Sequence, residues 1–244
     1  MWKNCYITRR NVFFYLSIMV LITASCTKDK YYTEGGKSDP VFKGTILQYL
    51  ESKPVPFDSV VAVIKLAKLE TQFSGENITF FAPTDYSIKK AILNTNAFLY
   101  RYGKDTINTL NDIDPAIWKK YLQMYMFHGS NKLKDYYQID FSLKSVYPGQ
   151  NYYSYNNTIF NIGVEYNDVV YTDASNNSVK GIKYAGYRQL KLSYIYDLSD
   201  PQNSWYTSTV ASSDIQPSNG VVHVLNNNHV FGFGWFYSDV YASK

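Results

Sequence analysis

The spacing of hydrophobic positions changes near the middle of this 244-residue chain. In the first half, apolar side chains recur every three or four residues, notably over 57–69 and 115–129, and this period predicts amphipathic helices. In the second half, short runs of β-branched and aromatic residues are separated by Asn, Asp, Gly and Ser, which predicts strands joined by turns. Helices followed by strands favour an α+β fold over a parallel α/β fold.

Local signals predict where several of these elements begin and end. Thr45 is expected to cap a short helix, and Asp58 or Ser59 to cap the helix that follows it. Gly129 is expected to end the helix that begins at Pro115. The expected strands are Tyr152–Tyr155, Ile159–Tyr166, Asp168–Thr172, Ile182–Tyr187 and Leu190–Tyr196.

The segment Ile78–Asp85 has the pattern of a short buried strand that turns into a helix. Its apolar run is stopped by Pro83, which cannot donate a hydrogen bond to a neighbouring strand. Thr84 or Asp85 can then cap a helix whose next apolar residues fall on one face. We expect this corner to fix the angle between a sheet and the helix that covers it.

A second corner lies in Ile215–Leu225. Asn219 and Gly220 both tolerate positive φ angles, so the pair predicts a tight turn. The apolar run after the turn predicts a buried strand, which is interrupted by His223. We expect this histidine to be a hydrogen-bonded core residue, and a role as a ligand is the alternative.

Together the two corners resemble the two signature boxes of the fasciclin domain. Phe80–Asp85 is similar to the first box, and Asn219–Leu225 is similar to the second. Between them, His128 matches the histidine of a family Tyr-His pair, but Phe127 replaces the tyrosine, which bears on any adhesion role of that pair. The resemblance implies structural roles for Phe81, Ala82, Pro83, Thr84, Asp85, His128, Asn219, Gly220 and His223.

The resemblance also implies a domain organisation. The expected fold is a single α+β domain over residues 41–244, a β-sandwich wedge flanked by helices. The chain is longer than a minimal member of the family, and the excess is expected as enlarged strands and loops over residues 134–212. Such an insertion is where a specific function would be carried, because loops tolerate change and commonly bear binding residues.

The N-terminus resembles a bacterial lipoprotein signal over residues 1–25. A basic start is followed by 11 mostly apolar residues, too few to span a bilayer, and then by small residues and Cys26. Cys26 is therefore the expected site of lipid attachment, and an ordinary secretory signal is the alternative. Residues 26–40 are expected to form a flexible tether, and their charged start resembles surface-exported outer-membrane lipoproteins of the Bacteroidota.

Processing changes the charge and the thiol content. The whole chain carries a net charge of +4, but removal of the signal leaves 21 basic and 20 acidic residues. This balance argues against nucleic acid as a partner, because nucleic-acid binding needs a concentrated basic face. Cys5 lies in the removed segment, so a lipidated Cys26 leaves no thiol for disulfides, and a hydrophobic core must provide stability.

The sequence offers little for catalysis. Its three histidines have no metal-binding spacing, and neither a nucleophile elbow nor a phosphate-binding glycine loop occurs, so no metal and no cofactor are expected. Paired carboxylates for glycoside hydrolysis stay open, because their spacing is spatial. We interpret the scattered acids of the second half as surface residues; they are Asp135, Asp140, Glu165, Asp168 and Asp173.

Three functions follow from these observations. The first is an adhesion or interaction module that is tethered to the envelope and binds envelope or extracellular proteins or polysaccharide. The second is a glycan-binding accessory protein of an outer-membrane nutrient importer, because aromatic rings can stack on sugars. Its expected contacts are Tyr147, Tyr152, Tyr153 and Tyr155, although a tyrosine-rich β-protein is the plainer interpretation. An enzyme is the least favoured of the three.

Overall fold

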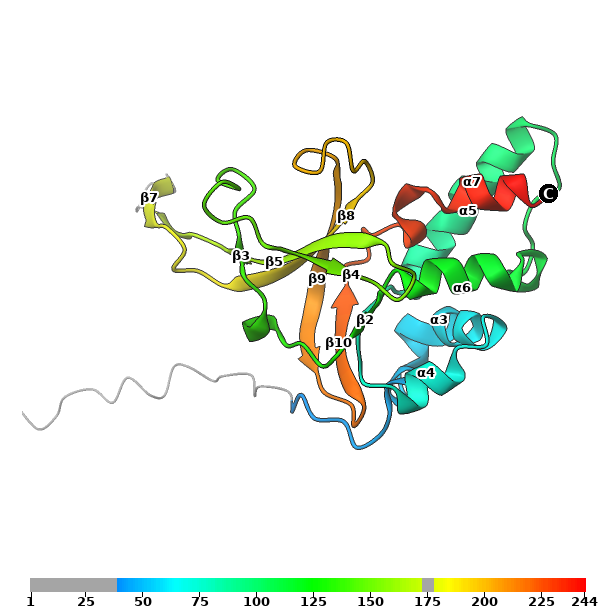
Figure 1. Cartoon of the computed structure of the whole chain (residues 1–244), viewed down its shortest axis with the longest axis horizontal. Helices are drawn as coiled ribbons and strands as arrows, with labels where there is room; N and C mark the ends of the chain where they lie inside the picture. The colour runs from blue at the N-terminus through cyan, green and yellow to red at the C-terminus, as the bar shows by residue number, and fades with distance from the viewer. Residues whose placement is uncertain (1–38, 173–177) are drawn as a thin grey trace, which may run out of the picture. The chain divides into compact units, whose positions relative to one another are not determined.

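The strands pair into a curled sheet, and the helices gather along one side of it (Figure 1). The computed structural model describes residues 39–172 and 178–244, and residues 40–244 form one compact unit. The helices are α2 (Ile46–Glu51), α3 (Pro54–Leu66), α4 (Glu70–Gly75), α5 (Asp85–Arg101), α6 (Pro115–Gln123) and α7 (Phe236–Ala242), with short 3-10 turns η2 (Leu110–Asp112), η3 (Leu133–Asp135) and η4 (Phe231–Gly234). The strands are β1 (Ile78–Ala82), β2 (Met126–His128), β3 (Gln138–Ile139), β4 (Gln150–Tyr153), β5 (Ile159–Tyr166), β6 (Val169–Thr172), β7 (Ser178–Ile182), β8 (Arg188–Ile195), β9 (Trp205–Ile215) and β10 (Gly220–Leu225).

Eight of the described strands form the main sheet, in the order β2-β1-β10-β9-β8-β5-β3, with β4 also paired to β5. β1 runs parallel to β10 and β3 runs parallel to β5, whereas the other pairs are antiparallel. β6 and β7 form a separate hairpin. The parallel pair β1–β10 matters most for the site, because it brings together segments that are far apart in sequence: Phe81 is the register partner of His223.

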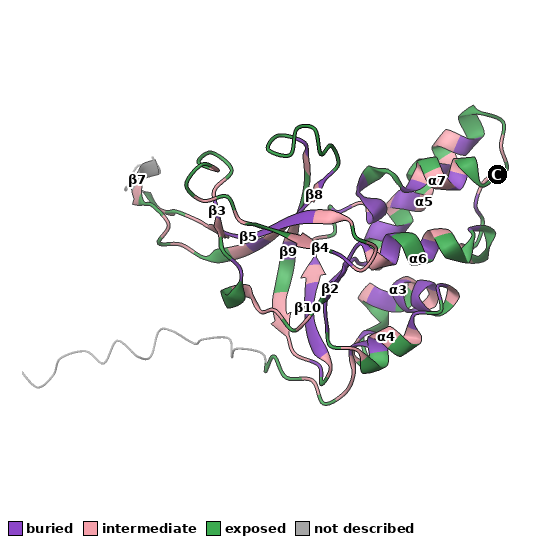
Figure 2. Cartoon of the chain, viewed as in Figure 1, coloured by how far each residue is buried: buried purple, intermediate pink, exposed green. Residues whose placement is uncertain are grey.

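A hydrophobic core lies between the sheet and the helices (Figure 2). Each large apolar side chain that is fully buried contributes about 1.5–3 kcal/mol relative to an exposed one. The described residues contain no cysteine, so packing rather than disulfide bonds stabilises this unit. The largest fully buried side chains are mostly aromatic: Trp118, Tyr125, Phe57, Phe73, Phe80, Phe81, Phe160, Phe231 and Phe236.

The mixed α+β class predicted from the sequence is confirmed, but the first long helix begins and ends earlier than predicted. α3 starts at Pro54 and stops at Leu66, where Lys68 takes a positive φ of 54°. The Leu69 amide then bonds back to the Ile64 carbonyl at 3.1 Å, which is the pattern of a left-handed helix cap. Lysine in this conformation gives no sequence signal, because such caps are usually glycine.

The predicted helix from Pro115 to Gly129 is also shorter than expected. α6 ends at Gln123, and Met126–His128 forms strand β2 at the edge of the sheet beside β1. Gly129, with φ at 87°, follows the strand instead of ending the helix. An apolar run of this length fits either a buried helix or a buried strand, and pairing with β1 decides between them.

In the second half, β9 and β7 depart most from the prediction. β9 was not predicted, because its 11 residues are rich in Ser, Thr and Ala; it is a strand because β8 and β10 pair with its two edges. The strand expected over 182–187 is wrong in position. The observed strand β7 is Ser178–Ile182, and Tyr184 lies in a turn with φ at 59°. Asp168 stabilises this turn by accepting a 2.8 Å bond from the Tyr184 amide.

Candidate functional site

The two signature segments lie side by side as the parallel strands β1 and β10. Phe80 pairs with Val222 and Phe81 with His223, and none of the four side chains is exposed. β1 is buried over all five residues, up to the point where Pro83 ends the strand. The signature residues therefore form the interior of the sheet.

Asn219 connects three elements through its side-chain amide. Its Oδ1 accepts a 2.8 Å bond from the Ile46 amide at the start of α2. Its Nδ2 donates to the Phe73 carbonyl at 3.1 Å and to the Glu76 carbonyl at 3.0 Å, at the end of α4. All three bonds satisfy backbone groups that a helix end leaves without a partner.

Gly220 follows at the start of β10 and must be a glycine. Its φ is 156°, and a Cβ there would lie 1.9 Å from the Ile78 carbonyl oxygen on the neighbouring strand. The predicted tight turn is present, since the Gly220 amide bonds the Pro217 carbonyl at 3.4 Å. Its reason differs from the expected one, because the close approach of two parallel strands, and not a pair of positive φ angles, requires the glycine.

Thr84 and Asp85 make contacts across the fold instead of capping their own helix. Thr84 occupies the N-cap position of α5, but its hydroxyl donates to Asn227 Oδ1 at 2.8 Å. Asp85 Oδ1 accepts from the Ser59 amide at 2.9 Å and the Val60 amide at 3.2 Å. Asp85 thus serves the first turns of α3, and the predicted caps from residues 58 or 59 themselves are wrong, because no side chain caps α3 at its own N-terminus.

His223 is a fully buried neutral histidine. Its Nε2 donates to the Asn131 carbonyl at 3.0 Å, and its Nδ1 accepts from the Asp214 amide at 3.2 Å, so both ring nitrogens are used. Burial lowers the pKa of His223 to about 4, and the neutral form therefore persists at physiological pH. The ring also packs on Phe81 with 5.0 Å between centroids.

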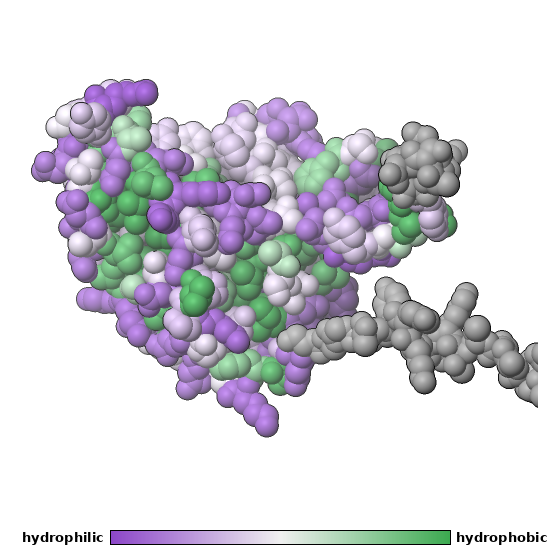
Figure 3. All heavy atoms as spheres, turned by 180° about the vertical axis from the view of Figure 1, so that it is seen from behind, coloured by the Kyte–Doolittle hydropathy of each residue, from purple (hydrophilic) through white to green (hydrophobic). Residues whose placement is uncertain are grey.

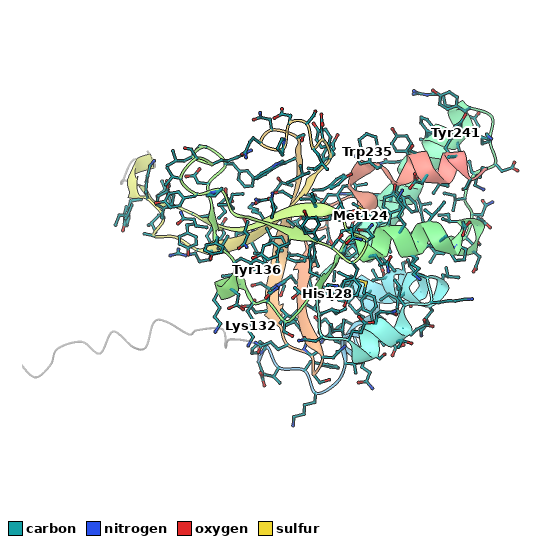
Figure 4. The ribbon with its side chains drawn as sticks, in the orientation of Figure 1. Met124, His128, Lys132, Tyr136, Trp235 and Tyr241 are labelled. Carbon is teal, nitrogen blue, oxygen red and sulfur yellow. The ribbon has the colours of Figure 1, made fainter. Side chains whose placement is uncertain are left out.

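His128 differs from the other signature residues because it is exposed. It ends β2, where Figure 4 labels it. Its ring stacks on Tyr155 with centroids 4.1 Å apart. Tyr155 is itself held in place by a hydrogen bond, since its hydroxyl donates to Glu76 Oε2 at 2.7 Å. The predicted position of His128 at a helix end is wrong, because this part of the chain is a strand.

The four tyrosines predicted to contact a glycan do not meet at one place. Tyr152 and Tyr153 are neighbours on β4, so their side chains point to opposite faces. Tyr152 packs on Tyr136 at 5.5 Å, whereas the Tyr153 side chain is 65% exposed. Tyr147 lies in the loop before β4 and packs on a different ring, that of Tyr184, at 5.5 Å.

Three of the acidic residues do converge. Asp140, Glu165 and Asp168 line a pocket of about 410 Å³ between β3, β5 and the β6–β7 hairpin, together with Tyr166 and Tyr184. The Tyr184 hydroxyl donates to Asp140 Oδ2 at 2.8 Å. Asp135 does not line this pocket, and Asp173 lies outside the described residues.

A second polar cluster was missed by the sequence analysis. Tyr125, Ser208 and His229 form a buried chain of hydrogen bonds, in which His229 Nε2 lies 2.7 Å from Tyr125 Oη and Nδ1 lies 2.6 Å from Ser208 Oγ. Sequence reasoning had no signal for it, because the partners of the histidine are 104 and 21 residues away. Over residues 39–172 and 178–244, no group of three or more His, Cys, Asp or Glu residues is arranged to hold a metal ion.

These features define a mixed α+β domain whose two signature boxes form adjacent buried strands of its sheet. The fasciclin domain family matches residues 55–228, and the chain belongs to this family, which is linked to adhesion and protein interaction. A search of curated proteins found no match. No helix in the described part of the chain is both long and apolar enough to cross a membrane.

One solved structure with similarity is described as a FAS1 domain pair from the insect cell adhesion molecule Fasciclin I. It is 15% identical in sequence, with a TM-score of 0.45, and the alignment covers 75% of this chain. This chain spans 49% of that domain pair.

Proposed function

We propose that this chain is a non-catalytic adhesion or interaction module of the cell envelope, held at the outer membrane by a lipid on Cys26. Membership of the fasciclin family supports the first part. The lipid and the location rest on the sequence pattern of residues 1–30, all of which lie outside the described residues. A tethered module of this kind gains strength from many anchored copies that act together.

The observation that carries the proposal is the inward orientation of the second signature box. The side chain of Asn219 is engaged in three internal hydrogen bonds, and both nitrogens of His223 are engaged as well. Groups that are satisfied inside the fold are poor candidates for partner contacts, since a partner would have to break those bonds. Partner binding is therefore assigned to the surface, and first to the enlarged region over 134–212.

Two loops of this region expose an apolar surface, which we call the loop patch. It consists of Phe141, Leu143 and Val146 from the loop after β3, of Tyr196 and Leu198 from the loop after β8, and of the partly buried Trp205 at the start of β9. In Figure 1 these loops are drawn in green and gold above the sheet. They touch, because Lys144 Nζ lies 4.0 Å from the Trp205 ring centre and donates to the Gln202 carbonyl at 2.6 Å.

Aromatic side chains are enriched at the centres of protein interfaces, and the loop patch contributes Phe141, Tyr196 and Trp205 beside its aliphatic residues. Val146 is 57% exposed and Leu198 is 63% exposed, yet Trp205 is held by a 2.6 Å bond from its Nε1 to the Pro201 carbonyl. A patch that is already ordered loses little conformational freedom when it binds. The partner that fits it is a protein surface with an exposed apolar area.

An adhesion assay tests this function. Beads coated with the whole purified chain are expected to attach to cells of the parent bacterium or to one another, and Val146→Asp with Leu198→Asp is expected to reduce attachment at least tenfold. Val55→Asp with Tyr100→Asp is the matched control, since these residues are 90% and 80% exposed on the helices. Attachment that survives the first pair of changes would remove the loop patch from the proposal, and folded wild-type beads that never attach would remove adhesion.

The lipid anchor has an independent test. Metabolic labelling with palmitate is expected to mark the wild-type chain, and Cys26→Ala is expected to abolish the label and release the chain from the membrane fraction. Cys5→Ala is the control, because that residue lies within the predicted signal peptide. Unchanged labelling of the Cys26 variant would contradict lipidation.

Binding of polysaccharide is the second candidate function, and the pocket of about 410 Å³ favours it. The carboxylates of Glu165 and Asp168 can accept hydrogen bonds from sugar hydroxyls, and Tyr184 offers an aromatic ring at the rim. Of the four tyrosines predicted from the sequence, only Tyr147 contributes here, because it packs on Tyr184.

Titration calorimetry against plant and host polysaccharides tests this candidate. Asp168→Ala is expected to abolish a binding signal, whereas Tyr153→Ala, on an exposed residue outside the pocket, is expected to leave it unchanged. Flat traces for the wild-type chain across the panel would remove the candidate.

A further inference from the structure

A small pocket of about 250 Å³ opens beside the buried Tyr125–His229–Ser208 chain. Its walls come from α5, from β9 and from the segment before α7, which are distant in sequence. Trp235, labelled in Figure 4, directly follows this segment. The lining residues are Asn94, Tyr206, Thr207, Ser208, Asn228, His229, Val230, Phe233 and Gly234.

The direction of the hydrogen bonds in the chain can be worked out from its buried end. Tyr125 Oη accepts a 2.8 Å bond from the Gly232 amide, so its own hydrogen needs an acceptor. His229 Nε2, at 2.7 Å, is the one that the described residues provide. The opposite assignment would leave the hydroxyl hydrogen of a fully buried tyrosine without a partner, which costs about 1–3 kcal/mol.

This direction fixes the state of the outer members of the chain. With Nε2 as acceptor, the neutral ring carries its hydrogen on Nδ1 and donates it to Ser208 Oγ at 2.6 Å. Burial keeps the ring neutral, because it lowers the pKa of His229 to about 3. Ser208 has no other hydrogen-bond partner among the described residues, so its hydroxyl hydrogen is free to bond a group in the pocket. Successive bonds of one sense polarise each other and strengthen that last donor.

The backbone at the pocket wall is strained. Phe233 has a φ of 53° between Gly232 at 75° and Gly234 at 85°. A left-handed phenylalanine is unfavourable by about 1–3 kcal/mol, and such strain concentrates at ligand-binding segments. The strain has a visible consequence here, since it holds the Phe233 ring against His229 with 4.8 Å between centroids.

The character of the lining restricts the ligand. None of the lining residues carries a charge at neutral pH, so a buried carboxylate or ammonium group would lack a counter-ion. The pocket offers a hydroxyl donor at Ser208, two amides at Asn94 and Asn228, and an apolar wall at Phe233. A neutral carbonyl oxygen, an adjacent N–H and a methyl group would together satisfy these features.

We propose that this pocket binds the acetamido group of an N-acetylated sugar, with the Ser208 hydroxyl donating to the acetamido oxygen. The Asn94 and Asn228 amides bond the N–H and the ring hydroxyls, and Phe233 covers the methyl group. Asn94 and Gly234 also line a neighbouring hollow of about 350 Å³, where a longer glycan has room to continue. The site is separate from the loop patch and from the acidic pocket, so it stands whether or not adhesion is demonstrated.

An NMR titration of the whole chain with N-acetylglucosamine tests the proposal, with glucose and N-acetylalanine methylamide in parallel. Saturable binding of N-acetylglucosamine is expected, at least tenfold tighter than that of glucose or of the peptide amide. Ser208→Ala is expected to weaken it at least tenfold. Ser212→Ala, which removes the same hydroxyl from an exposed position on β9, is expected to leave it unchanged.

Asn94→Ala provides a second variant, because this residue is exposed on α5 and its loss leaves the core intact. It is expected to weaken binding even if Ser208→Ala lowers the melting temperature. Absence of saturation with N-acetylglucosamine, equal binding of glucose, or full affinity in the Asn94 variant would each overturn the proposal. Equally tight binding of the peptide amide would reassign the pocket to peptide ligands and overturn the sugar.

Discussion

Single side chains of the second signature box join parts of the chain that are far apart in sequence. Asn219 reaches Ile46, 173 residues away, and Phe73, 146 residues away. His223 reaches the Asn131 carbonyl, 92 residues away. Each contact satisfies a backbone group that would otherwise be left without a partner, so these residues stabilise the fold at the places where α2, α4 and the segment after β2 meet the sheet.

Replacement of Asn219 by alanine tests this role. Asn219→Ala removes three hydrogen bonds and leaves one amide and two carbonyls unsatisfied, so the free energy of unfolding is expected to fall by about 3 kcal/mol. Denaturant unfolding followed by circular dichroism measures it. Asn203→Ala is the control, because Asn203 bonds only to exposed Asp200, and a change under about 0.5 kcal/mol is expected. Equal losses in the two variants would argue against the role of Asn219.

At the level of elements, the helix that covers the sheet is fixed by its neighbour. The first turns of α3 have no cap of their own, and the Asp85 carboxylate at the start of α5 accepts two of their amides. Burial raises the pKa of Asp85, although the bonds from those amides oppose this shift. One carboxylate therefore links α3 to the start of α5, beside the apolar side chains that both helices bury in the core.

Replacement of Asp85 and replacement of Asp58 are expected to change the free energy of unfolding differently. Asp85→Ala is expected to lower the free energy of unfolding by about 1–2 kcal/mol, since it removes a cap, and Asp85→Asn is expected to cost less because the amide oxygen still accepts. Asp58→Ala is expected to be nearly neutral, because Asp58 caps nothing and its charge opposes that of Asp85. Urea denaturation of the three variants measures these changes. A larger loss of stability in the Asp58 variant than in the Asp85 variants would support the cap expected from the sequence.

The elements that could be predicted from the sequence are those in which local signals and packing agree. β1 ends where Pro83 requires it, and β5 spans the predicted residues Ile159–Tyr166. β9 could not be predicted, because its strand conformation depends on two neighbouring strands and not on its own Ser-rich sequence. The cross-helix cap by Asp85 has the same character, since a residue that caps a distant helix looks like one that caps its own.

The residues of the site also divide into those that the sequence could predict and those that it could not. The sequence singled out the two boxes because glycine, proline and Asn-Gly corners are local features. The Tyr125–His229–Ser208 chain and the acidic pocket depend on residues brought together only by the folded sheet, and no spacing predicts them. The four predicted tyrosines show the opposite case: they are close in sequence, but the fold does not place them on one face.

For the whole domain, the two buried histidines predict sensitivity to acid. Their pKa values in the folded state, about 4 for His223 and about 3 for His229, lie below the usual 6.5. The unfolded chain therefore binds more protons below pH 6.5, and stability that is complete above that pH is lost as the pH falls toward 4. The free energy of unfolding is expected to fall by roughly 3 kcal/mol per pH unit between about pH 6 and pH 4, from two protons taken up.

Urea unfolding at a series of pH values measures this slope. His223→Gln, which has no titrating ring, is expected to reduce it by about half, and His128→Gln at the exposed histidine is expected to leave it unchanged. A flat profile between pH 6 and pH 4 in the wild-type chain would show that the histidines are not buried as neutral rings.

The domain also presents its apolar surface unevenly. Hydrophobic residues are gathered in places on the rear face, including the side that the helices form (Figure 3). A groove of about 390 Å³ has apolar lining from Ile88, Ile92 and Leu93 of α5 and from Leu110. The loop patch is a second set of exposed apolar side chains, and it lies within residues 134–212, which the sequence predicts to be enlarged. The division between an internal signature and an external patch is the central claim about how this fasciclin domain works.

One crossed measurement tests that claim most directly: stability and bead attachment determined for the same two variants, well below both melting temperatures. The account predicts that Asn219→Ala loses about 3 kcal/mol of stability and keeps its attachment, because its contacts are internal. It predicts that Val146→Asp with Leu198→Asp keeps its stability and loses attachment, because these side chains are exposed. Folded Asn219→Ala that no longer attaches, beside a loop-patch variant that attaches normally, would contradict it.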